Sequence, residues 1–215
     1  MLSLFLYNCV IDSNFVKNSN LHPTTDRLVP KELKEQSLGH TGGVFWLYGL
    51  SGSGKSTLAI EMEKRLHHKK LISVVLDGDN LRSGLNSDLG FSDEDRKENI
   101  RRISEVAKLF SDNGMITLVS LISPKREFRE NAKNIIGAAR FHEIYIKASF
   151  AKCQERDVKG LYAKAADGRV TSFTGLGSNF EEPAIECLTI DTEHESLEDS
   201  ANRLFSYIKD SVRLN

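Results

Sequence analysis

Eight residues, Gly49 to Ser56, carry the clearest chemical pattern in the sequence and read G-L-S-G-S-G-K-S. They match the phosphate-binding pattern G-x-x-x-x-G-K-[ST] at every fixed position. The glycines allow successive backbone N–H groups to turn towards one anion. Lys55 can then reach the β- and γ-phosphates of ATP, and the Ser56 hydroxyl can bind Mg²⁺. The alternative is a chance glycine turn. The predicted ATP-binding residues are Gly49, Leu50, Ser51, Gly52, Ser53, Gly54, Lys55, Ser56 and Thr57.

Two acidic residues, Asp77 and Asp79, follow the next apolar segment of the chain. Acids at the carboxyl end of a strand in an open α/β sheet lie where such sheets bind ligands. Two carboxylates beside a phosphate loop predict that one or both hold Mg²⁺ or accept a proton. We therefore predict metal ligands at Ser56, Asp77 and Asp79. A plain Asp-Gly turn is the alternative for residues 77–79.

A third group of polar residues lies on a predicted helix that ends near residue 113. Ser92, with an acid three positions later, is typical of a helix start. Three side chains on this helix repeat every three residues and share one side: Arg96, Asn99 and Arg102. They form either a binding face or a solvated one. Phe91, just before the cap, is either a ligand contact or a hydrophobic staple.

The elements that must position these groups alternate between strand and helix patterns. Strands are predicted at 44–48, 72–76, 115–121, 141–147 and 188–190, and helices at 31–37, 55–66, 93–113, 125–136, 150–156 and 197–212. Strands that are apolar throughout, separated by crossover-length helices, predict a mostly parallel sheet. The predicted fold class is α/β: the three-layer sandwich of P-loop NTPases, with five mostly parallel strands and helices on both faces.

Composition excludes several classes of protein. A chain of 215 residues with 40% hydrophobic residues can bury a sizeable core as one domain. Its net charge of −1 gives no bulk attraction to nucleic acid or anionic membrane. No apolar run approaches the roughly 18 residues that a membrane span needs. Three scattered cysteines, Cys9, Cys153 and Cys187, form no disulfide framework and indicate a reducing, cytoplasmic compartment.

The two least regular regions are the start of the chain and a late loop. Residues 1–11 are mostly apolar, and a secretory signal is one interpretation, but no basic residue precedes the run. A flexible tail, or a start codon assigned too far upstream, is favoured. Residues 1–40 are predicted to form a partly flexible N-terminal arm, and residues 41–215 the main domain. The Gly/Ser-rich loop at 171–178 predicts a mobile lid over about residues 156–183.

With these residues in view, the chain resembles the adenylylsulfate kinase (APS kinase) family over roughly residues 20–210. The phosphate loop alone is shared by many families, so the resemblance depends on further stretches in the family's order. These are Asp77-Gly78-Asp79-Asn80 with Arg82, Asp88 to Ser92 with Asp95-Arg96 and Glu98 to Arg102, Ile122-Ser123-Pro124, Arg156-Asp157 with Lys159 to Tyr162, and Phe173-Thr174-Gly175.

The resemblance implies transfer of the γ-phosphate of ATP to the 3′-hydroxyl of adenosine 5′-phosphosulfate, with Mg²⁺. By matching motif, Phe91 and Phe173 clamp the substrate's adenine, and Asp79 faces the 3′-hydroxyl. Four polar side chains hold the ribose and phosphosulfate: Arg82, Arg96, Asn99 and Lys159. The substrate-binding residues so implied are Asp79, Asn80, Arg82, Phe91, Arg96, Asn99, Ile122, Ser123, Lys159, Phe173 and Thr174. The catalytic residues are Lys55, Asp79 and Ser123.

Several points stay open at this stage. In the family the Ser123 position has been described as a phosphoserine intermediate, but in-line transfer needs no covalent step and a turn hydroxyl beside Pro124 is the alternative. The chain departs from the family at Lys125, at residues 147–150 and at residues 177–180, none of which has a chemical role here. The family also implies a homodimer and a functional link to an ATP sulfurylase on another chain. Another small-molecule kinase of the same fold, or a catalytically silent nucleotide-binding domain, are the alternatives.

Overall fold

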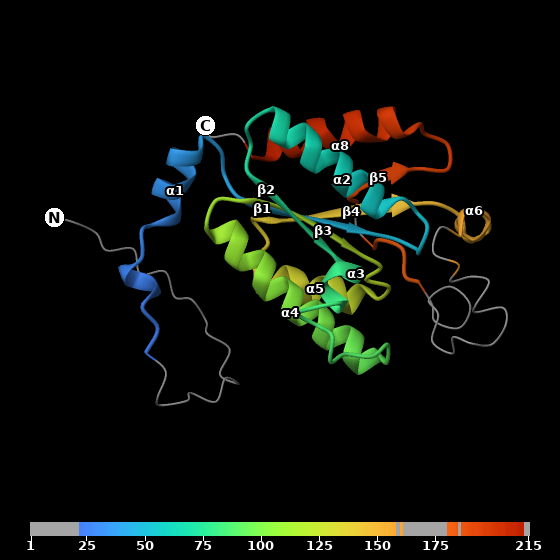
Figure 1. Cartoon of the computed structure of the whole chain (residues 1–215), viewed down its shortest axis with the longest axis horizontal. Helices are drawn as coiled ribbons and strands as arrows, with labels where there is room; N and C mark the ends of the chain where they lie inside the picture. The colour runs from blue at the N-terminus through green and yellow to red at the C-terminus, as the bar shows by residue number, and fades with distance from the viewer. Residues whose placement is uncertain (1–21, 158–159, 161–179, 185, 213–215) are drawn as a thin grey trace.

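The computed structural model describes residues 22–157, 160, 180–184 and 186–212 (Figure 1). Its five strands are β1 (Gly43–Tyr48), β2 (Ser73–Asp77), β3 (Ile116–Leu121), β4 (Phe141–Lys147) and β5 (Leu188–Asp191). They form one sheet in the order β2-β3-β1-β4-β5, and every neighbouring pair is parallel. The predicted five-stranded sheet is therefore confirmed, and in the described part of the chain it is parallel throughout.

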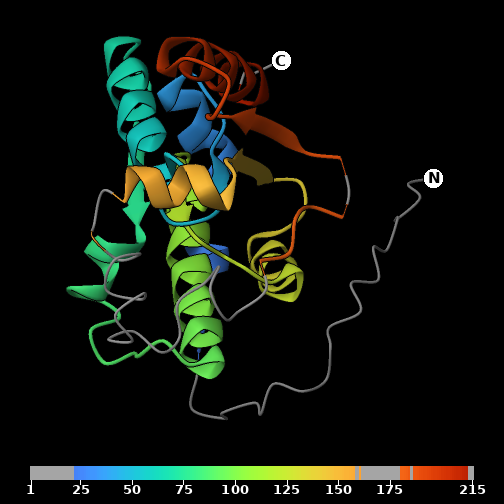
Figure 2. The ribbon, with the colours of Figure 1, turned by 90° about the vertical axis from the view of Figure 1, so that its right-hand side faces the viewer.

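Helices cover both faces of this sheet (Figures 1 and 2). Their bounds are η1 (Thr25–Arg27), α1 (Lys31–Leu38), α2 (Lys55–His68), α3 (Gly78–Arg82), α4 (Asp93–Asp112), α5 (Arg126–Ile136), α6 (Phe150–Arg156) and α8 (Leu197–Ser211). One apolar cluster joins α2 and α8 to the sheet, and a second joins α4 and α5 to the other face. These layers are the predicted three-layer sandwich.

The central strand β1 connects the two apolar clusters. All six of its residues are buried, because its side chains alternate between the two covered faces. Phe45 and Leu47 pack in the cluster with α2 and α8, whereas Trp46 and Tyr48 pack in the cluster with α4 and α5. This strand has no solvent-facing side, so its carboxyl end is held rigidly between β3 and β4. The phosphate-binding sequence begins at that end.

The first long helix, α1, is joined to the main domain by a buried carboxylate. Glu35 accepts a hydrogen bond from the Gly42 backbone N–H at 2.9 Å and from Arg140 Nη2 at 2.7 Å. Gly39, with φ of 74°, ends the helix in the left-handed conformation that favours glycine. The helix matches the predicted segment 31–37. The boundary predicted at residue 40 stays a prediction, and this ion pair crosses it.

Two local sequence signals have different outcomes. The Ser92 hydroxyl accepts a hydrogen bond from the Asp95 backbone N–H at 3.1 Å, which confirms the predicted start of α4. The plain Asp-Gly turn offered as an alternative for residues 77–79 is wrong. Asp77 ends β2 and also caps the short helix α3, because its side chain accepts a hydrogen bond from the Asp79 backbone N–H. The strand passes directly into the helix, so both acids are fixed by regular structure.

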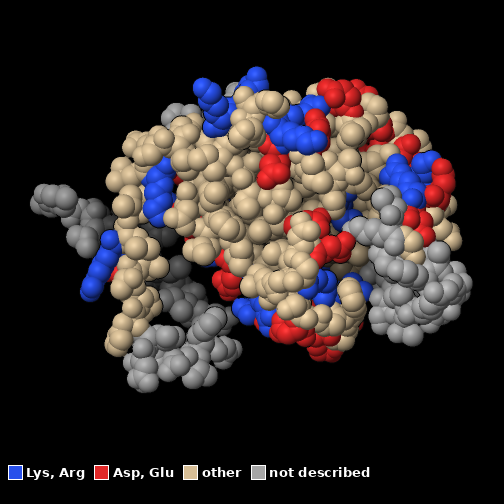
Figure 3. All heavy atoms as spheres, viewed as in Figure 1, with Lys and Arg blue, Asp and Glu red and all other residues tan. Residues whose placement is uncertain are grey.

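Surface charge is mixed on the face shown in Figure 3, where Lys and Arg side chains are interspersed with Asp and Glu. Such a distribution matches the net charge of −1. In the described part of the chain, no helix combines the length and the hydrophobicity that crossing a bilayer requires.

Candidate active site

The predicted phosphate loop connects the carboxyl end of β1 to the start of α2. Gly54 caps α2 with φ of 96°, a backbone conformation that residues with a side chain rarely adopt. A Cβ atom on Gly49 would lie 2.3 Å from the Ile146 carbonyl oxygen, so the loop also passes too close to β4 for any other residue. The loop therefore leads directly into the N-terminus of α2, a position where the helix dipole favours a bound phosphate.

The Lys55 ammonium lies inside this loop. It donates hydrogen bonds to the Leu50 carbonyl at 2.6 Å and to Ser53 Oγ at 3.4 Å, and the side chain is 8% exposed. A buried cation at a helix N-terminus concentrates positive potential where the loop N–H groups converge. This geometry agrees with the predicted contact between Lys55 and the β- and γ-phosphates.

The predicted metal ligands Ser56 and Asp77 contact each other directly. Ser56 Oγ donates to Asp77 Oδ2 at 2.7 Å and lies 3.2 Å from Ser120 Oγ. Ser120 is opposite Asp77 in the pairing of β2 with β3, which explains why the three meet. Sequence reasoning missed Ser120, because a serine inside an apolar strand carries no chemical signal. Hydroxyl and carboxylate oxygens are the donors that Mg²⁺ accepts beside phosphate and water, so this set fits the ion.

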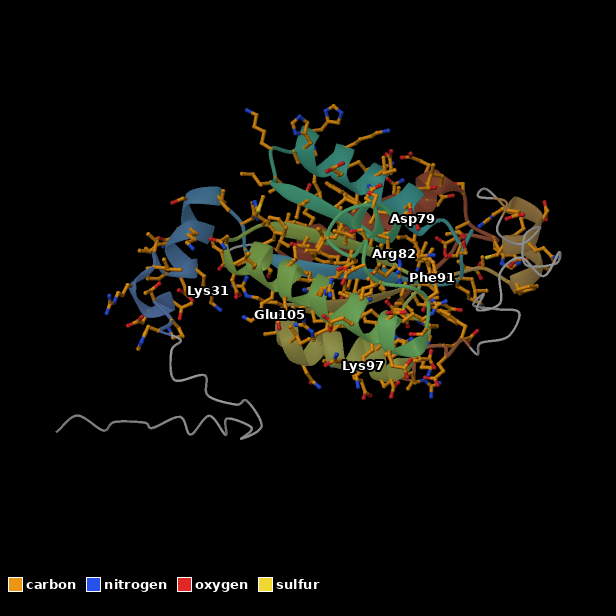
Figure 4. The ribbon with its side chains drawn as sticks, turned by 60° about the horizontal axis from the view of Figure 1, so that its bottom comes forward. Lys31, Asp79, Arg82, Phe91, Lys97 and Glu105 are labelled. Carbon is orange, nitrogen blue, oxygen red and sulfur yellow. The ribbon has the colours of Figure 1, made fainter. Side chains whose placement is uncertain are left out.

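The other predicted acid, Asp79, lies in the first turn of α3 with Asn80 beside it. Both side chains are exposed, and the Asp79 backbone N–H donates to Asp77 Oδ1 at 3.0 Å. Asp77 therefore uses one carboxylate oxygen for Ser56 and the other for α3. The predicted metal contact of Asp79 stays a prediction. In Figure 4, Asp79, Arg82 and Phe91 lie in the same region, far from Lys31 in the N-terminal arm.

Phe91 lies close to two guanidinium groups. Its ring is 60% exposed, with Arg82 Cζ 4.3 Å and Arg96 Cζ 5.9 Å from the ring centroid. Arg82 donates to the Leu89 and Gly90 carbonyls, and Arg96 donates to the Phe91 carbonyl. A hydrophobic staple would be covered by its own helix, so the exposed ring favours the ligand interpretation.

The two guanidinium groups also influence each other electrostatically. Burial lowers the pKa of Arg96, and the nearby charge of Arg82 lowers it further. Burial likewise lowers the pKa of Arg82, against the opposing effect of the Asp95 and Asp79 carboxylates. Both groups keep their charge at neutral pH, because an arginine titrates far above it. Two cations that repel each other beside an exposed ring form a site suited to an anionic aromatic ligand.

Asn99 is buried on the same side of α4 as Arg96. Its Oδ1 accepts a hydrogen bond from Asn86 Nδ2 at 3.0 Å, and Asn86 is fully buried. Asn86 Oδ1 has no hydrogen-bond partner among the described residues. Asn86 fixes the orientation of the Asn99 amide, a role that nothing in its own sequence neighbourhood indicates.

Arg102, the third residue of this helical face, has a structural role. It forms paired hydrogen bonds with Asp88 at 2.7 and 2.9 Å and a third with Glu98 at 2.8 Å. Hydrogen bonds from Arg101 and Arg102 lower the pKa of Glu98 to about 2. These contacts tie the loop that carries Phe91 to α4. The alternative of a wholly solvated face is thus wrong: Asn99 is buried and Arg102 is paired.

Ile122 and Ser123 follow β3 and line the phosphate loop. The Ile122 carbonyl accepts the Gly49 backbone N–H at 3.4 Å. Ser123 has φ of 43°, is 3% exposed, and its Oγ accepts a hydrogen bond from Trp46 Nε1 at 2.9 Å. The strained backbone and the occupied hydroxyl indicate a positioned loop residue. Sequence reasoning missed Trp46, which it assigned only to the strand.

Two residues from the far end of the chain support the phosphate loop from outside. Thr192 Oγ1 donates to the Ser53 carbonyl at 2.8 Å, and Arg156 Nη1 donates to the Gly52 carbonyl at 3.2 Å. Arg156 also donates to the Thr192 carbonyl at 2.6 Å. The loop is therefore held by the segments after β5 and at the end of α6. No short-range pattern could reveal these contacts.

The described residues thus bring together most of the predicted site. The phosphate loop, the two acids, the Arg82–Phe91–Arg96 cluster, Asn99 and the Ser123 loop all lie at the carboxyl edge of the sheet or at the adjoining start of α4. Three predicted substrate contacts, Lys159, Phe173 and Thr174, lie outside the described residues. So do residues 1–11 and most of the predicted lid.

Comparisons with known proteins agree with this geometry. Residues 41–191 match the family model described as adenylylsulphate kinase. An adenylyl-sulfate kinase of Phocaeicola vulgatus is 50% identical over 193 residues, which cover 90% of this chain and 95% of that protein. A second, from Bacteroides fragilis, is 49% identical over 89% of this chain and 95% of that protein.

A solved structure of the Mycobacterium tuberculosis APS kinase, in complex with AMPPNP and APS, is 43% identical with a TM-score of 0.76. The match covers 79% of this chain and 98% of that one. By family model, by identity and by fold, this chain belongs to the adenylyl-sulfate kinase family.

Proposed function

We propose that this chain transfers the γ-phosphoryl group of ATP to the 3′-hydroxyl of adenosine 5′-phosphosulfate, giving 3′-phosphoadenosine 5′-phosphosulfate and ADP. The observation that carries the proposal is the exposed Phe91 ring close to Arg82 and Arg96, at the end of α4 that lies nearest the phosphate loop. A purine needs a flat apolar surface, and a phosphosulfate needs cations. A sugar or shikimate acceptor has no purine to stack on this ring.

On the donor side, the phosphate loop and Lys55 bind the triphosphate and position its γ-phosphoryl group. Phosphoryl transfer depends chiefly on positioning and on electrostatic stabilisation of the transferring group. Ser56, Asp77 and Ser120 would hold Mg²⁺ through oxygen. When bound, the ion neutralises charge on the β- and γ-phosphate oxygens.

On the acceptor side, Asp79 accepts the proton of the attacking 3′-hydroxyl. In the sequence, Asp79 follows the phosphate loop and precedes Phe91. Its side chain is exposed at the start of α3, and α3 fixes its backbone. Arg82, Arg96 and Asn99 orient the phosphosulfate and ribose, and Asn80 and Ile122 complete the acceptor contacts. The Ser123 hydroxyl, bonded to Trp46, serves as a positioning group in direct in-line transfer.

An acceptor panel with product identification tests the reaction. Purified protein with ATP and Mg²⁺ is offered adenosine 5′-phosphosulfate, AMP, gluconate and shikimate, and products are identified by mass. We expect adenosine 5′-phosphosulfate to gain one phosphate at its 3′ position and the sugar-type acceptors to remain unchanged. A preference for gluconate or shikimate, or no product with any acceptor, would contradict the proposal.

Replacing Phe91 by alanine is expected to weaken the acceptor nucleotide selectively. Stacking of a base on an aromatic ring is worth roughly 1–3 kcal/mol, so the KM for adenosine 5′-phosphosulfate should rise about 5- to 150-fold. Steady-state kinetics in both substrates measures the effect, and the KM for ATP should change little. F91Y keeps the ring and should stay near wild type. Equal losses for both nucleotides would show that Phe91 is not an acceptor contact.

Three further expectations accompany this function. We expect a homodimer, as the family implies. One related protein that assembles is a hexameric APS kinase from Thiobacillus denitrificans. It is 28% identical with a TM-score of 0.60, over 83% of this chain and 31% of that one. Light scattering of the purified chain tests this. We expect a cytoplasmic enzyme, because three cysteines scattered along the sequence are typical of a reducing compartment. An ATP sulfurylase on another chain would supply the acceptor.

A further inference from the structure

We propose that Arg129 of α5 is a positioning residue that holds the Ser123 loop in its acceptor-binding conformation and joins that loop to the segment at Glu181. The assignment of this loop to the acceptor side rests on the proposed function. Arg129 itself contacts neither reacting group in the scheme above. Its effect on the reaction is exerted through the backbone of its neighbours.

The Arg129 guanidinium contacts three separate segments of the chain. Its Nε donates to Glu143 Oε1 in β4 at 2.9 Å, and its Nη1 donates to the Ser123 carbonyl at 2.9 Å. Its Nη2 donates to the Glu181 carbonyl, also at 2.9 Å. The same group lies over the Tyr48 ring, with Cζ 4.3 Å from the centroid. Each of the three guanidinium nitrogens thus donates to a different segment, and one face of the group lies over Tyr48.

Burial makes these contacts specific to arginine. The Arg129 side chain is 2% exposed, and the paired Glu143 side chain is 17% exposed. A buried cation needs a counter-charge and hydrogen-bond acceptors on its remaining donors, and here each is present. Burial and the nearby Glu143 carboxylate both raise the pKa of the Tyr48 hydroxyl, so the tyrosine beneath the guanidinium stays neutral. A lysine could keep the charge, but it has no rigid fork to reach three acceptors.

The Ser123 loop is the part of the site that most needs such support. Ser123 has φ of 43°, a conformation that costs free energy and persists only where its surroundings impose it. Trp46 Nε1 holds the Ser123 hydroxyl, and Arg129 holds the Ser123 carbonyl. Hydrogen bonds therefore hold both the side chain and the backbone carbonyl of Ser123. The neighbouring Ile122 carbonyl accepts the Gly49 backbone N–H at 3.4 Å, so Ile122 has a hydrogen bond of its own that does not involve Arg129.

The same arginine joins the Ser123 loop to the chain that returns towards β5. The Glu181 backbone N–H donates to the Pro124 carbonyl at 2.8 Å, beside the Arg129 contact with the Glu181 carbonyl. The Glu181 carboxylate accepts the Arg126 backbone N–H at 2.7 Å at the start of α5. Residues 122–124 and 180–182 therefore form one hydrogen-bonded unit, and Arg129 lies at its buried centre.

Arg140, which directly precedes β4, provides a matched control for Arg129. It is also a largely buried arginine, paired with Glu35 at 2.7 Å and donating to the Ser111 carbonyl. It differs in location, because it lies at the start of β4, at the opposite end of the strands from the phosphate loop. R129K and R140K each replace a fork by a single ammonium group. The two variants separate a general loss of stability from a loss of position.

The experiment compares R129K, E143Q and R140K with wild type in steady-state kinetics for both substrates. A displacement of about 1 Å at a reacting group can cost on the order of 100-fold, so kcat/KM for adenosine 5′-phosphosulfate should fall by about that factor in R129K. The KM for ATP should stay within about two-fold of wild type, because the loop contacts to phosphate remain. E143Q, which keeps Arg129 but weakens its anchor, should change in the same direction by less. R140K should lose thermal stability but keep both KM values.

Fluorescence provides a readout that does not depend on the substrate. Trp46 is the one tryptophan of the chain, and its indole N–H bonds to the Ser123 hydroxyl. S123A removes that acceptor and sets the reference change in Trp46 emission. R129K should shift the emission in the same direction as S123A, and R140K should leave it as in wild type.

The outcomes separate this proposal from the proposed reaction. Wild-type Trp46 emission in R129K, or equal changes of both KM values in R129K and R140K, would overturn the role of Arg129. If the wild-type protein left adenosine 5′-phosphosulfate unphosphorylated, the proposed reaction would fail. The Trp46 emission of R129K and R140K would then still decide whether Arg129 holds the Ser123 loop.

Discussion

Replacing Lys55 by alanine should lower kcat by about 10²- to 10³-fold, the scale associated with losing one preorganised electrostatic contact to a transition state. The Lys55 ammonium lies within the phosphate loop, bonded to the Leu50 carbonyl and 8% exposed. Charge that develops on the transferring phosphoryl group would meet this cation in a site screened from water. Initial-rate kinetics with saturating ATP and acceptor measures the effect.

The matched control for this prediction is K64A, which removes an exposed lysine from the same helix. It should leave kcat unchanged. K55A should keep its circular dichroism spectrum, because the hydrogen bonds lost from this charged group are worth only about 1.5–3 kcal/mol each. Turnover of K55A within ten-fold of wild type would remove Lys55 from the mechanism.

Replacing Asp79 by asparagine should reduce kcat by about 10²- to 10⁴-fold, the usual contribution of general acid–base catalysis. Asparagine has the same shape but cannot take the proton of the 3′-hydroxyl. Since the side chain is exposed in α3, the change should spare the fold and the KM for adenosine 5′-phosphosulfate. Rapid-quench measurement of the transfer step distinguishes slow chemistry from slow product release.

D112N is the control for the Asp79 prediction. Asp112 is a partly exposed acid at the far end of α4, paired with Lys108, and its loss should leave kcat unchanged. Turnover of D79N like that of D112N would show that Asp79 is not the proton acceptor. A raised Mg²⁺ requirement in D79N, with kcat restored at high Mg²⁺, would instead assign it to the metal.

The features that could be predicted from sequence were those encoded over short distances. The loop from Gly49 to Ser56 is a contiguous pattern whose strand and helix neighbours are also local, and its location is confirmed. Ser92 and the acid three positions later specify the start of α4 in the same way. The pairing of Ser56 with Asp77 followed from one rule, because strand ends in a parallel sheet meet at one edge.

The features that could not be predicted depend on contacts between distant residues. Ser120 reaches Ser56 across 64 positions, and Trp46 reaches Ser123 across 77. Arg129 was visible only as one more cation on a helix, because its acceptors are backbone carbonyls that any residue could supply. Asn86 is similar, since a buried amide in a loop has no periodicity to reveal it. The register of the sheet, not the local pattern, decides these contacts.

The outer support of the phosphate loop has a consequence for protein engineering. Thr192 and Arg156 hold the carbonyls of Ser53 and Gly52 from segments that follow the loop by more than one hundred positions. A segment containing only Gly49 to Ser56, transplanted into another protein, would leave those carbonyls without their hydrogen-bond donors. The glycines of the loop would then adopt many backbone conformations. Nucleotide affinity here belongs to three dispersed pieces of chain, and a successful graft must transfer all three together.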